Sequence, residues 1–112
     1  MSTRYVPERG DAVWLSFDPK TGHEQAGRRP ALVLSPLAYN RSIGLAVVCS
    51  MTTKVKGYPF EVLSLVAGSE GAVLADHVRS IDWIARRAKR IGAVDEAVVR
   101  RVAAIVSKLV GA

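Results

Sequence analysis

The stretch ALVLSPLAYNRSIGLAVVCSM, residues 31–51, decides the fold. It contains two apolar runs of strand length, 31–37 and 44–51, which are rich in branched side chains and therefore predict buried strands. The polar segment AYNRSIG between them, residues 38–44, predicts a connection of the hairpin type. We therefore expect these two strands to be neighbours in an antiparallel sheet.

Further strands are expected on both sides of this pair. Residues 11–17 alternate between apolar and other side chains with a period of two, which is typical of a strand. Apolar segments at 60–66 and 71–77 predict two more strands, joined by a glycine-rich turn. A short helical turn is expected near 80–86, followed by a strand near 91–94.

The C-terminal segment has the pattern of one amphipathic helix. Asp95 is suited to cap its start, and Gly111 lies where a helix would stop. The apolar side chains that recur at helical spacing are Val98, Val102, Ile105, Val106, Leu109 and Val110. Short strands followed by one helix predict a single, mainly β (α+β) domain over residues 1–112. Its architecture would be a small, strongly curved antiparallel sheet or barrel with a C-terminal helix.

Composition and charge narrow the class of protein. Apolar residues make up 49% of the chain, enough for a core without metal or disulfide. The net charge of +6 and the pI of about 10.0 favour an anionic partner, with nucleic acid first; the alternative is a basic surface that is merely solvated. No apolar run approaches the ~20 residues that cross a bilayer, so no membrane association is expected.

The single cysteine indicates the compartment. Cys49 has no partner for an intrachain disulfide, and the chain begins without a signal-peptide pattern, so we expect a cytoplasmic protein. Because Cys49 lies inside an apolar strand, a buried and inert thiol is the preferred interpretation, and a nucleophile is the alternative.

No cofactor or metal is expected. His23 and His77 are far apart in the sequence, and Cys49 does not complete a usual zinc set with them. The chain has no phosphate-binding glycine loop and no Gly-x-Ser-x-Gly motif. A barrel of this size also lacks an internal cavity, so a ligand would bind on the surface or across a subunit boundary.

Two polar loops next to core strands are the candidate site. The first, residues 18–30, and the second, residues 52–59, supply His23, Glu24, Gln25, Arg28, Arg29, Thr52, Thr53, Lys54 and Lys56. If the flanking strands pair, Arg29 and Thr52 lie at one rim. The arginine fork and the threonine hydroxyl are suited to hold a phosphodiester and to stabilise its pentavalent transition state. A solvated strand edge and an ordinary turn are the alternative interpretation.

Several ordered motifs resemble one protein family. RYVPERGDAVWLSFDPKTGHEQAGRRPALVLSPLAYN, TTKVKGYPFEV and LADHVRSIDWIARRA resemble the MazF/PemK toxins of bacterial toxin–antitoxin systems, and the MazF branch most. The resemblance implies a small SH3-like antiparallel barrel with a C-terminal helix, assembled as a homodimer. It also implies a metal-independent endoribonuclease that cleaves single-stranded RNA. The implied inhibitor is a cognate antitoxin that lays an acidic, disordered segment across the RNA groove.

The resemblance assigns catalytic roles residue by residue. Arg29 matches the family arginine before proline, Thr52 the threonine at the start of the second loop, and Glu24 a glutamate linked to the active-site loop. In the family's reaction the ribose 2′-hydroxyl attacks the adjacent phosphate, leaving 2′,3′-cyclic phosphate and 5′-hydroxyl ends. Arginine stays protonated because its pKa is above about 12, so we expect Arg29 to act as a donor. Removal of the 2′ proton stays open between Glu24 and His23.

Other residues are expected to contact the substrate. Thr53 and Lys56 match positions that line the RNA groove of the family. The further substrate-binding candidates are His23, Gln25, Lys54, Asp76 and Arg79. One branch of the family uses a histidine, an arginine and an aspartate; here Leu74 occupies the arginine position. Ser50 occupies a position that is often proline in the family.

Basic residues are dense between 79 and 101, and we expect them to attract RNA or an acidic antitoxin. Two other functions remain open on the same fold. One is a non-catalytic barrel that binds nucleic acid or a peptide. The other is a toxin directed at DNA gyrase. The presence of Arg29 and Thr52 favours the nuclease.

Overall fold

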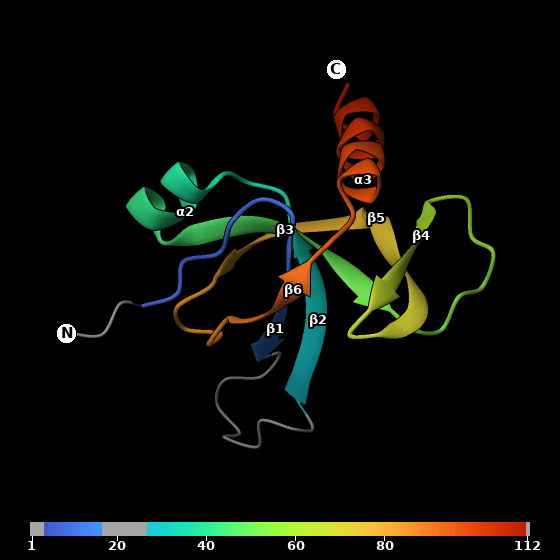
Figure 1. Cartoon of the computed structure of the whole chain (residues 1–112). Coiled ribbons are helices and arrows are strands. Elements are labelled where there is room, and N and C mark those ends of the chain that lie inside the picture. The colour runs from blue at the N-terminus through green and yellow to red at the C-terminus, as the bar shows by residue number, and fades with distance from the viewer. Residues whose placement is uncertain (1–3, 17–26, 112) are drawn as a thin grey trace.

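A computed structural model describes residues 4–16 and 27–111 of the chain. The elements within these residues are, in chain order, β1 (Asp11–Ser16), β2 (Arg28–Val33), α2 (Leu37–Ile43), β3 (Leu45–Thr52), β4 (Glu61–Val66), β5 (Ser69–Asp82), β6 (Lys89–Ala93) and α3 (Glu96–Leu109). Figure 1 shows the strands curling around one another, with α3 standing at one end of the sheet.

The strands form one sheet in the order β4-β5-β3-β2-β1-β6. Every neighbouring pair in it is antiparallel, so the sheet is a curled half-barrel with β4 and β6 at its edges. The expected fold class, mainly β with a curved antiparallel sheet and a C-terminal helix, is confirmed. The apolar runs 31–37 and 44–51 do supply neighbouring strands, β2 and β3.

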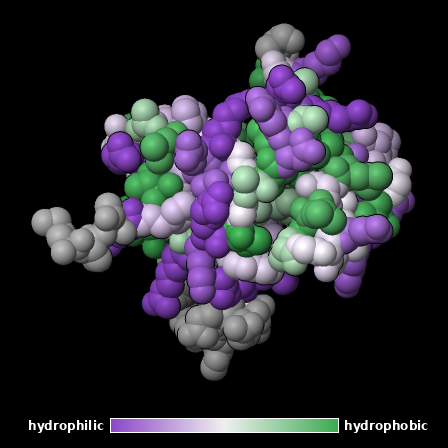
Figure 2. Space-filling model, in the orientation of Figure 1, coloured by the Kyte–Doolittle hydropathy of each residue, from purple (hydrophilic) through white to green (hydrophobic). Residues whose placement is uncertain are grey.

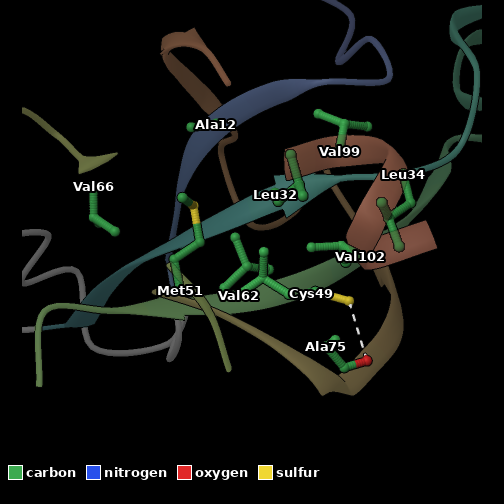
Figure 3. Packing of buried hydrophobic residues seen from close by; sticks show 11 residues of the cluster. Ala12, Leu32, Leu34, Cys49, Met51, Val62, Val66, Ala75, Val99 and Val102 are labelled. Carbon is green, nitrogen blue, oxygen red and sulfur yellow. Dashed lines mark hydrogen bonds between the residues drawn. The ribbon is translucent and has the colours of Figure 1, made fainter. Parts of the chain in front are cut away.

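The central strands β2 and β3 are buried on both faces, which explains why they are continuously apolar. Leu32 belongs to a cluster that includes Val99 and Val102 of α3 (Figure 3). Val33, its neighbour in β2, points to the other face and packs in a second cluster with Trp83. The strand pair β2–β3 is therefore fixed from above and below.

The connection at residues 38–44 joins antiparallel neighbours, as a hairpin-type connection should, but it contains a helix that was not predicted. Pro36 stands at the N-cap of α2, and Gly44 ends the helix in the left-handed conformation at φ 81°. Asn40 is fully buried, and its Nδ2 donates to the carbonyl oxygens of Pro7 (2.7 Å) and Ser35 (3.0 Å). The bond to Pro7, 33 residues away, helps to stabilise a short helix that the polar composition alone does not reveal.

Strand β2 begins at Arg28, three residues earlier than the apolar run at 31–37 predicts. Pairing with β1 extends the strand to Arg28, since Ser16 is opposite Arg28 and Leu15 is opposite Arg29. On the other side, the β2–β3 ladder ends at the Ala31–Ser50 pair. The next residue, Pro30, has no N–H to donate, which is where a ladder is expected to end.

The region after β4 also differs from prediction. Strand β5 continues to Asp82, so the segment near 80–86 is strand first and turn afterwards. The Asp82 carbonyl accepts from the Arg86 N–H at 3.0 Å, which makes the expected helical turn short and late. The final strand, predicted near 91–94, is β6 from Lys89 to Ala93.

The C-terminal helix follows the prediction closely. The Asp95 side chain caps it by accepting from the Ala97 N–H at 2.9 Å. Val102 is fully buried, as the apolar stripe predicts, and Val99, which is outside that stripe, is buried as well. Leu109 and Val110, at the far end, are 48% and 71% exposed. Among the described residues, no helix is long and apolar enough to span a membrane.

The surface view of Figure 2 separates two kinds of area on one face. Hydrophilic side chains gather along the middle, over β6 and β1, and apolar side chains gather toward β4 and the foot of α3. The exposed apolar residues of β4 are Leu63 and Leu65, 68% and 66% exposed. This contrast shows that the edge strand β4 carries apolar side chains on its outer face.

Candidate functional site

A cleft opens where β2 and β3 stop pairing. Its volume is about 510 Å³, and it is lined by Trp14, Arg29, Pro30, Met51, Thr52, Thr53, Lys54, Val66, Ala67 and Ser69. The cleft therefore brings together Arg29, Thr52, Thr53 and Lys54, which the sequence places in two separate loops. The proline that ends the β2–β3 ladder stands in its wall.

Arg29 and Thr52 come from opposite strands. Continuing the β2–β3 register two residues beyond the Ala31–Ser50 pair brings Arg29 opposite Thr52. Arg29 is exposed and Thr52 is half-buried. The predicted convergence of the two side chains on one rim is thus present in the structure, although both side chains stand on strands and not in loops.

The Thr52 hydroxyl is oriented by the loop that follows it. Its Oγ1 accepts from the Lys54 N–H at 3.0 Å. A threonine hydroxyl has one hydrogen to donate as well as lone pairs to accept. The accepted bond uses a lone pair, so the hydroxyl hydrogen stays available to donate to an anion in the cleft.

The two adjacent arginines have different surroundings. The Arg28 guanidinium lies 5.4 Å from the centroid of the Trp14 ring, a cation–π contact. Trp14 itself lines the cleft beside Arg29. Arg28 thus fixes an aromatic wall of the cleft, while Arg29 faces the cleft directly.

Two further arginines lie next to Arg29. A small cavity of about 30 Å³ is lined by Arg29, Arg79 and Arg86 among others. Arg79, on β5, was predicted to bind substrate, and the structure places it beside the catalytic candidate. The Arg86 guanidinium donates to the Ser16 carbonyl oxygen at 3.1 Å, so this arginine is held next to the start of the cleft wall.

The remaining basic residues between 79 and 101 are dispersed. Arg90 forms an ion pair with Asp11 at 3.2 Å, at the β1–β6 edge. Arg87 lines a different cavity, next to Arg4. The dense positive run seen in the sequence is therefore not one patch in the structure, because turn and strand geometry send its members in different directions.

A second cavity adjoins the first. Its volume is about 430 Å³, and it is lined by Thr52, Lys54, Lys56, Tyr58, Glu61, Leu74 and His77. Thr52 and Lys54 line both cavities, so the two form one continuous surface groove. The groove lies on the surface, outside the sheet's core, where the sequence analysis expects a ligand to bind.

Glu61 shapes the loop that borders this second cavity. Its carboxylate accepts from the backbone N–H groups of Lys56, Gly57 and Tyr58 at 3.0–3.2 Å. Charge-assisted bonds to three consecutive N–H groups hold a loop in one conformation. The positions of Lys56 and Tyr58 therefore depend on a side chain at the start of β4.

Asp76 lies behind the second cavity and holds Tyr58. The register between β3 and β5 shifts so that residues 74–77 bulge opposite Ser50. Asp76 Oδ2 accepts from the Tyr58 hydroxyl at 2.5 Å, and this hydrogen bond raises the pKa of Tyr58. Asp76 Oδ1 is buried, has no hydrogen-bond partner among the described residues, and lies 4.0 Å from His77 Nε2.

Gly71 lets the backbone of β5 lie close to the backbone of Thr52. A Cβ at this position would lie 2.2 Å from the Thr52 carbonyl oxygen and 2.8 Å from a methyl group of Val66. Only a hydrogen fits there without moving the backbone that carries Thr52. The absence of a side chain at Gly71 thus allows the short distance between the backbones of β5 and Thr52.

Three predicted site residues lie outside the described residues: Glu24, His23 and Gln25. Their roles stay predictions. Sequence reasoning missed Tyr58, Glu61 and Gly71, whose importance depends on which chain segments lie opposite them. Tyr58 and Glu61 do lie in TTKVKGYPFEV, one of the motifs that resemble the family, whereas Gly71 was assigned only to a glycine-rich turn and the start of the strand after it.

Cys49 is fully buried, as predicted. Burial raises the pKa of its thiol to about 12, and Sγ lies 3.7 Å from the Ala75 carbonyl oxygen (Figure 3). Since a thiol is nucleophilic only as the thiolate, Cys49 is inert at neutral pH. Within the described ranges, no three His, Cys, Asp or Glu side chains gather in a way that could hold a metal ion.

Comparison with known proteins identifies the family. The family model for the PemK-like, MazF-like toxin of type II toxin–antitoxin systems matches residues 8–110. The chain belongs to this family. It is 46% identical over 111 residues to the endoribonuclease toxin MazF of Escherichia coli K12, covering 99% of this chain and 100% of the relative. It is also 44% identical over 98 residues to the endoribonuclease toxin ChpB of the same organism, covering 81% and 84%.

Solved structures of the family agree with the fold. MazF (Form-I) from Deinococcus radiodurans is 50% identical and superimposes with a TM-score of 0.85, covering 97% of this chain and 100% of that one. MazF in the MazE–MazF (Form-II) structure from the same organism is 46% identical, with a TM-score of 0.84 and coverage of 96% and 98%. The resemblance inferred from the sequence motifs is thus confirmed.

Proposed function

We propose that this member of the PemK-like, MazF-like family is the toxin of a toxin–antitoxin system. It acts as a sequence-specific endoribonuclease that cleaves single-stranded RNA, mainly messenger RNA, without a metal ion. Cleavage inhibits translation and growth. The observation that carries the proposal is the convergence of Arg29 and Thr52, from two strands, on one surface cleft. The curated relatives at 46% and 44% identity are named endoribonucleases, which supports it.

The proposed reaction is a transfer within the substrate. The 2′-oxygen forms a bond to the adjacent phosphorus, and the bond from phosphorus to the 5′ oxygen breaks. Glu24 removes the 2′ proton, with His23 as the second candidate; Arg29 donates a proton to the leaving 5′ oxygen and regains one from water afterwards. Arg29 donates to the phosphorane oxygens, and the free hydrogen of the Thr52 hydroxyl binds a non-bridging oxygen. The products are a 2′,3′-cyclic phosphate and a 5′-hydroxyl.

The rim is suited to this reaction electrostatically. The phosphorane carries one more negative charge than the ground-state phosphodiester once the 2′ proton has left. Arg29, Arg79 and Arg86 surround one small cavity, and Lys54 and Lys56 border the groove. Fixed positive groups lower the energy of the more highly charged transition state most.

We further propose the partners that this role requires. The chain acts as a homodimer in the cytoplasm, with residues 1–112 as one domain. A cognate antitoxin inhibits it by laying an acidic, disordered segment over the basic groove. The net charge of +6 and the MazE–MazF structures of the family support such a complex.

The test uses the purified protein and a long single-stranded RNA in excess EDTA. Discrete cuts that carry 2′,3′-cyclic phosphate ends are expected. Binding of the RNA without cuts would instead indicate a non-catalytic binding barrel. Intact RNA together with inhibited DNA supercoiling by gyrase would indicate a gyrase-directed toxin. Either of these outcomes overturns the proposal.

A further inference from the structure

A further cavity lies at the turn between β5 and β6. Its volume is about 250 Å³, and its lining comes from two chain segments far apart in sequence: Arg4, Tyr5, Trp83, Ile84, Arg87 and Ala88. Among the described residues, it shares none of its lining with the cleft or with the second cavity. It is therefore a separate place on the surface, outside the groove that contains the candidate catalytic residues.

The charged groups that line this cavity are two arginines. Arg4 and Arg87 are both exposed, and they reach the cavity from opposite parts of the sequence. Among the described residues, no ion pair joins either guanidinium to a carboxylate. The acidic residues close to Arg4 in sequence do not fill the cavity, since Asp11 pairs with Arg90 and Glu8 is not part of the lining. The cavity therefore presents two cations to a ligand.

Arg87 has a backbone conformation that disfavours arginine. Its φ is 54°, in the left-handed region that glycine adopts most easily. The hydrogen bonds of the turn impose this conformation. The Arg87 N–H donates to the Ile84 carbonyl oxygen at 3.1 Å, and Asp82 Oδ1 accepts from the Ile84 N–H at 3.1 Å. Because the backbone favours glycine here, the presence of an arginine points to a use of its side chain.

The accessible apolar surface of the cavity is aliphatic. Ile84 is 46% exposed, whereas Trp83 is 5% exposed and its Nε1 donates to the Asn40 carbonyl oxygen at 2.9 Å. The Tyr5 ring is half-buried, and its hydroxyl is bound to Asp11. Unpaired bases bind proteins by stacking on exposed ring faces, which this lining lacks. The cavity therefore fits an aliphatic side chain flanked by carboxylates better than it fits a nucleotide.

We propose that this cavity binds an acidic peptide segment: Arg4 and Arg87 hold its carboxylates, and one of its aliphatic side chains packs on Ile84. Arginine forks bind carboxylates through two parallel hydrogen bonds. The occupant is the acidic segment of the antitoxin, so the inference rests on the proposed function. The cavity gives that segment a contact that the RNA does not share. Substitutions here therefore weaken inhibition without weakening cleavage.

The test is a titration of the full chain with a synthetic peptide of alternating glutamate and leucine, followed by NMR. The backbone amide resonances of Ile84 and Ala88 should shift, and their titration gives the dissociation constant of this cavity separately from the groove. Arg87→Gly should raise that constant roughly threefold, and Arg87→Gly combined with Arg4→Gln roughly tenfold. Because glycine suits the left-handed conformation, Arg87→Gly should unfold at no lower temperature than the wild type.

Matched controls decide the outcome. Arg41→Gln removes an exposed arginine of α2 that does not line the cavity, and it should leave the constant unchanged, as should both arginine variants for the rate of RNA cleavage. A peptide of alternating serine and leucine should not shift the two resonances.

Three results would overturn the proposal: no shift with the acidic peptide, an unchanged constant in the double variant, or a loss of affinity for a single-stranded oligodeoxynucleotide in place of the peptide. The last result would make the cavity a nucleic-acid contact. The peptide titration contains no RNA, so a wild-type protein that does not cleave RNA would contradict the proposed function alone.

Discussion

The two ends of the β2–β3 pair differ sharply. At one end Leu32, Val33 and Val48 are at most 2% exposed and lie in the clusters on both faces of the sheet. At the other end, beyond the last ladder pair, the exposed Arg29 and the half-buried Thr52 line a cleft. The candidate catalytic side chains thus stand on strands whose other ends are fixed in the core. This gives them a fixed geometry without the cost of burying their polar groups.

The largest expected effect on stability comes from truncating a side chain at the buried end of the β2–β3 pair. Leu32→Ala removes a fully buried side chain that packs with α3, so it should lower the free energy of unfolding by about 2–5 kcal/mol. Leu63→Ala, on the exposed face of β4, should change it by no more than about 0.5 kcal/mol. Urea denaturation of both variants measures the difference. Equal effects of the two substitutions would contradict the account of the buried end.

A smaller effect should come from the glycine that supports the open end. Gly71→Ala places a Cβ against the Thr52 carbonyl, so the backbone must shift, at a cost of about 1–3 kcal/mol. Because Thr52 moves with it, kcat for RNA cleavage should fall about tenfold with little change in KM. Gly92→Ala is the matched control, since its Cβ would meet nothing within 4 Å. A Gly71→Ala enzyme with wild-type kcat would show that the close packing of Gly71 against the Thr52 backbone does not position Thr52.

The smallest effect concerns the cap of the helix that covers the buried end. Asp95→Ala loses the bond from the Ala97 N–H and should lower stability by about 1 kcal/mol. Asp95→Ser keeps a capping oxygen and should recover most of the loss. Thermal unfolding of the two variants compares them. The cleavage rate per folded molecule should be unaffected in both, because α3 lies away from the cleft; a specific loss of activity would contradict the separation of the two ends.

The sequence predicted the elements whose signal is local. In β1, β2, β3 and α3 the order of buried and exposed side chains can be read from one continuous stretch of sequence. It gives a period of two in β1, apolar runs in β2 and β3, and a helical stripe in α3. The helix α2 was missed because the buried Asn40 ties it to Pro7, 33 residues away, and no local pattern shows such a bond. The far end of β5, residues 78–82, was missed because Arg79, Ser80 and Asp82 are polar and exposed, which hides the strand pattern.

The same distinction applies to the candidate site. The sequence located one group of cleft residues correctly because they lie at the adjacent ends of two neighbouring strands, β2 and β3. They are Arg29, Thr52, Thr53 and Lys54. Tyr58 and Glu61 were missed because their significance comes from side chains that meet across the fold, such as the bond between Tyr58 and Asp76.

The most direct test of the central claim is the cleavage rate of Arg29→Ala in EDTA. Arg41→Ala, an exposed arginine on α2 away from the groove, is the matched control, and Arg29→Lys separates charge from the guanidinium fork. We expect Arg29→Ala to lose at least roughly a hundredfold in rate, with wild-type thermal unfolding, while Arg41→Ala cleaves normally. Cleavage by Arg29→Ala at close to the wild-type rate would contradict the assignment of this rim as the catalytic centre.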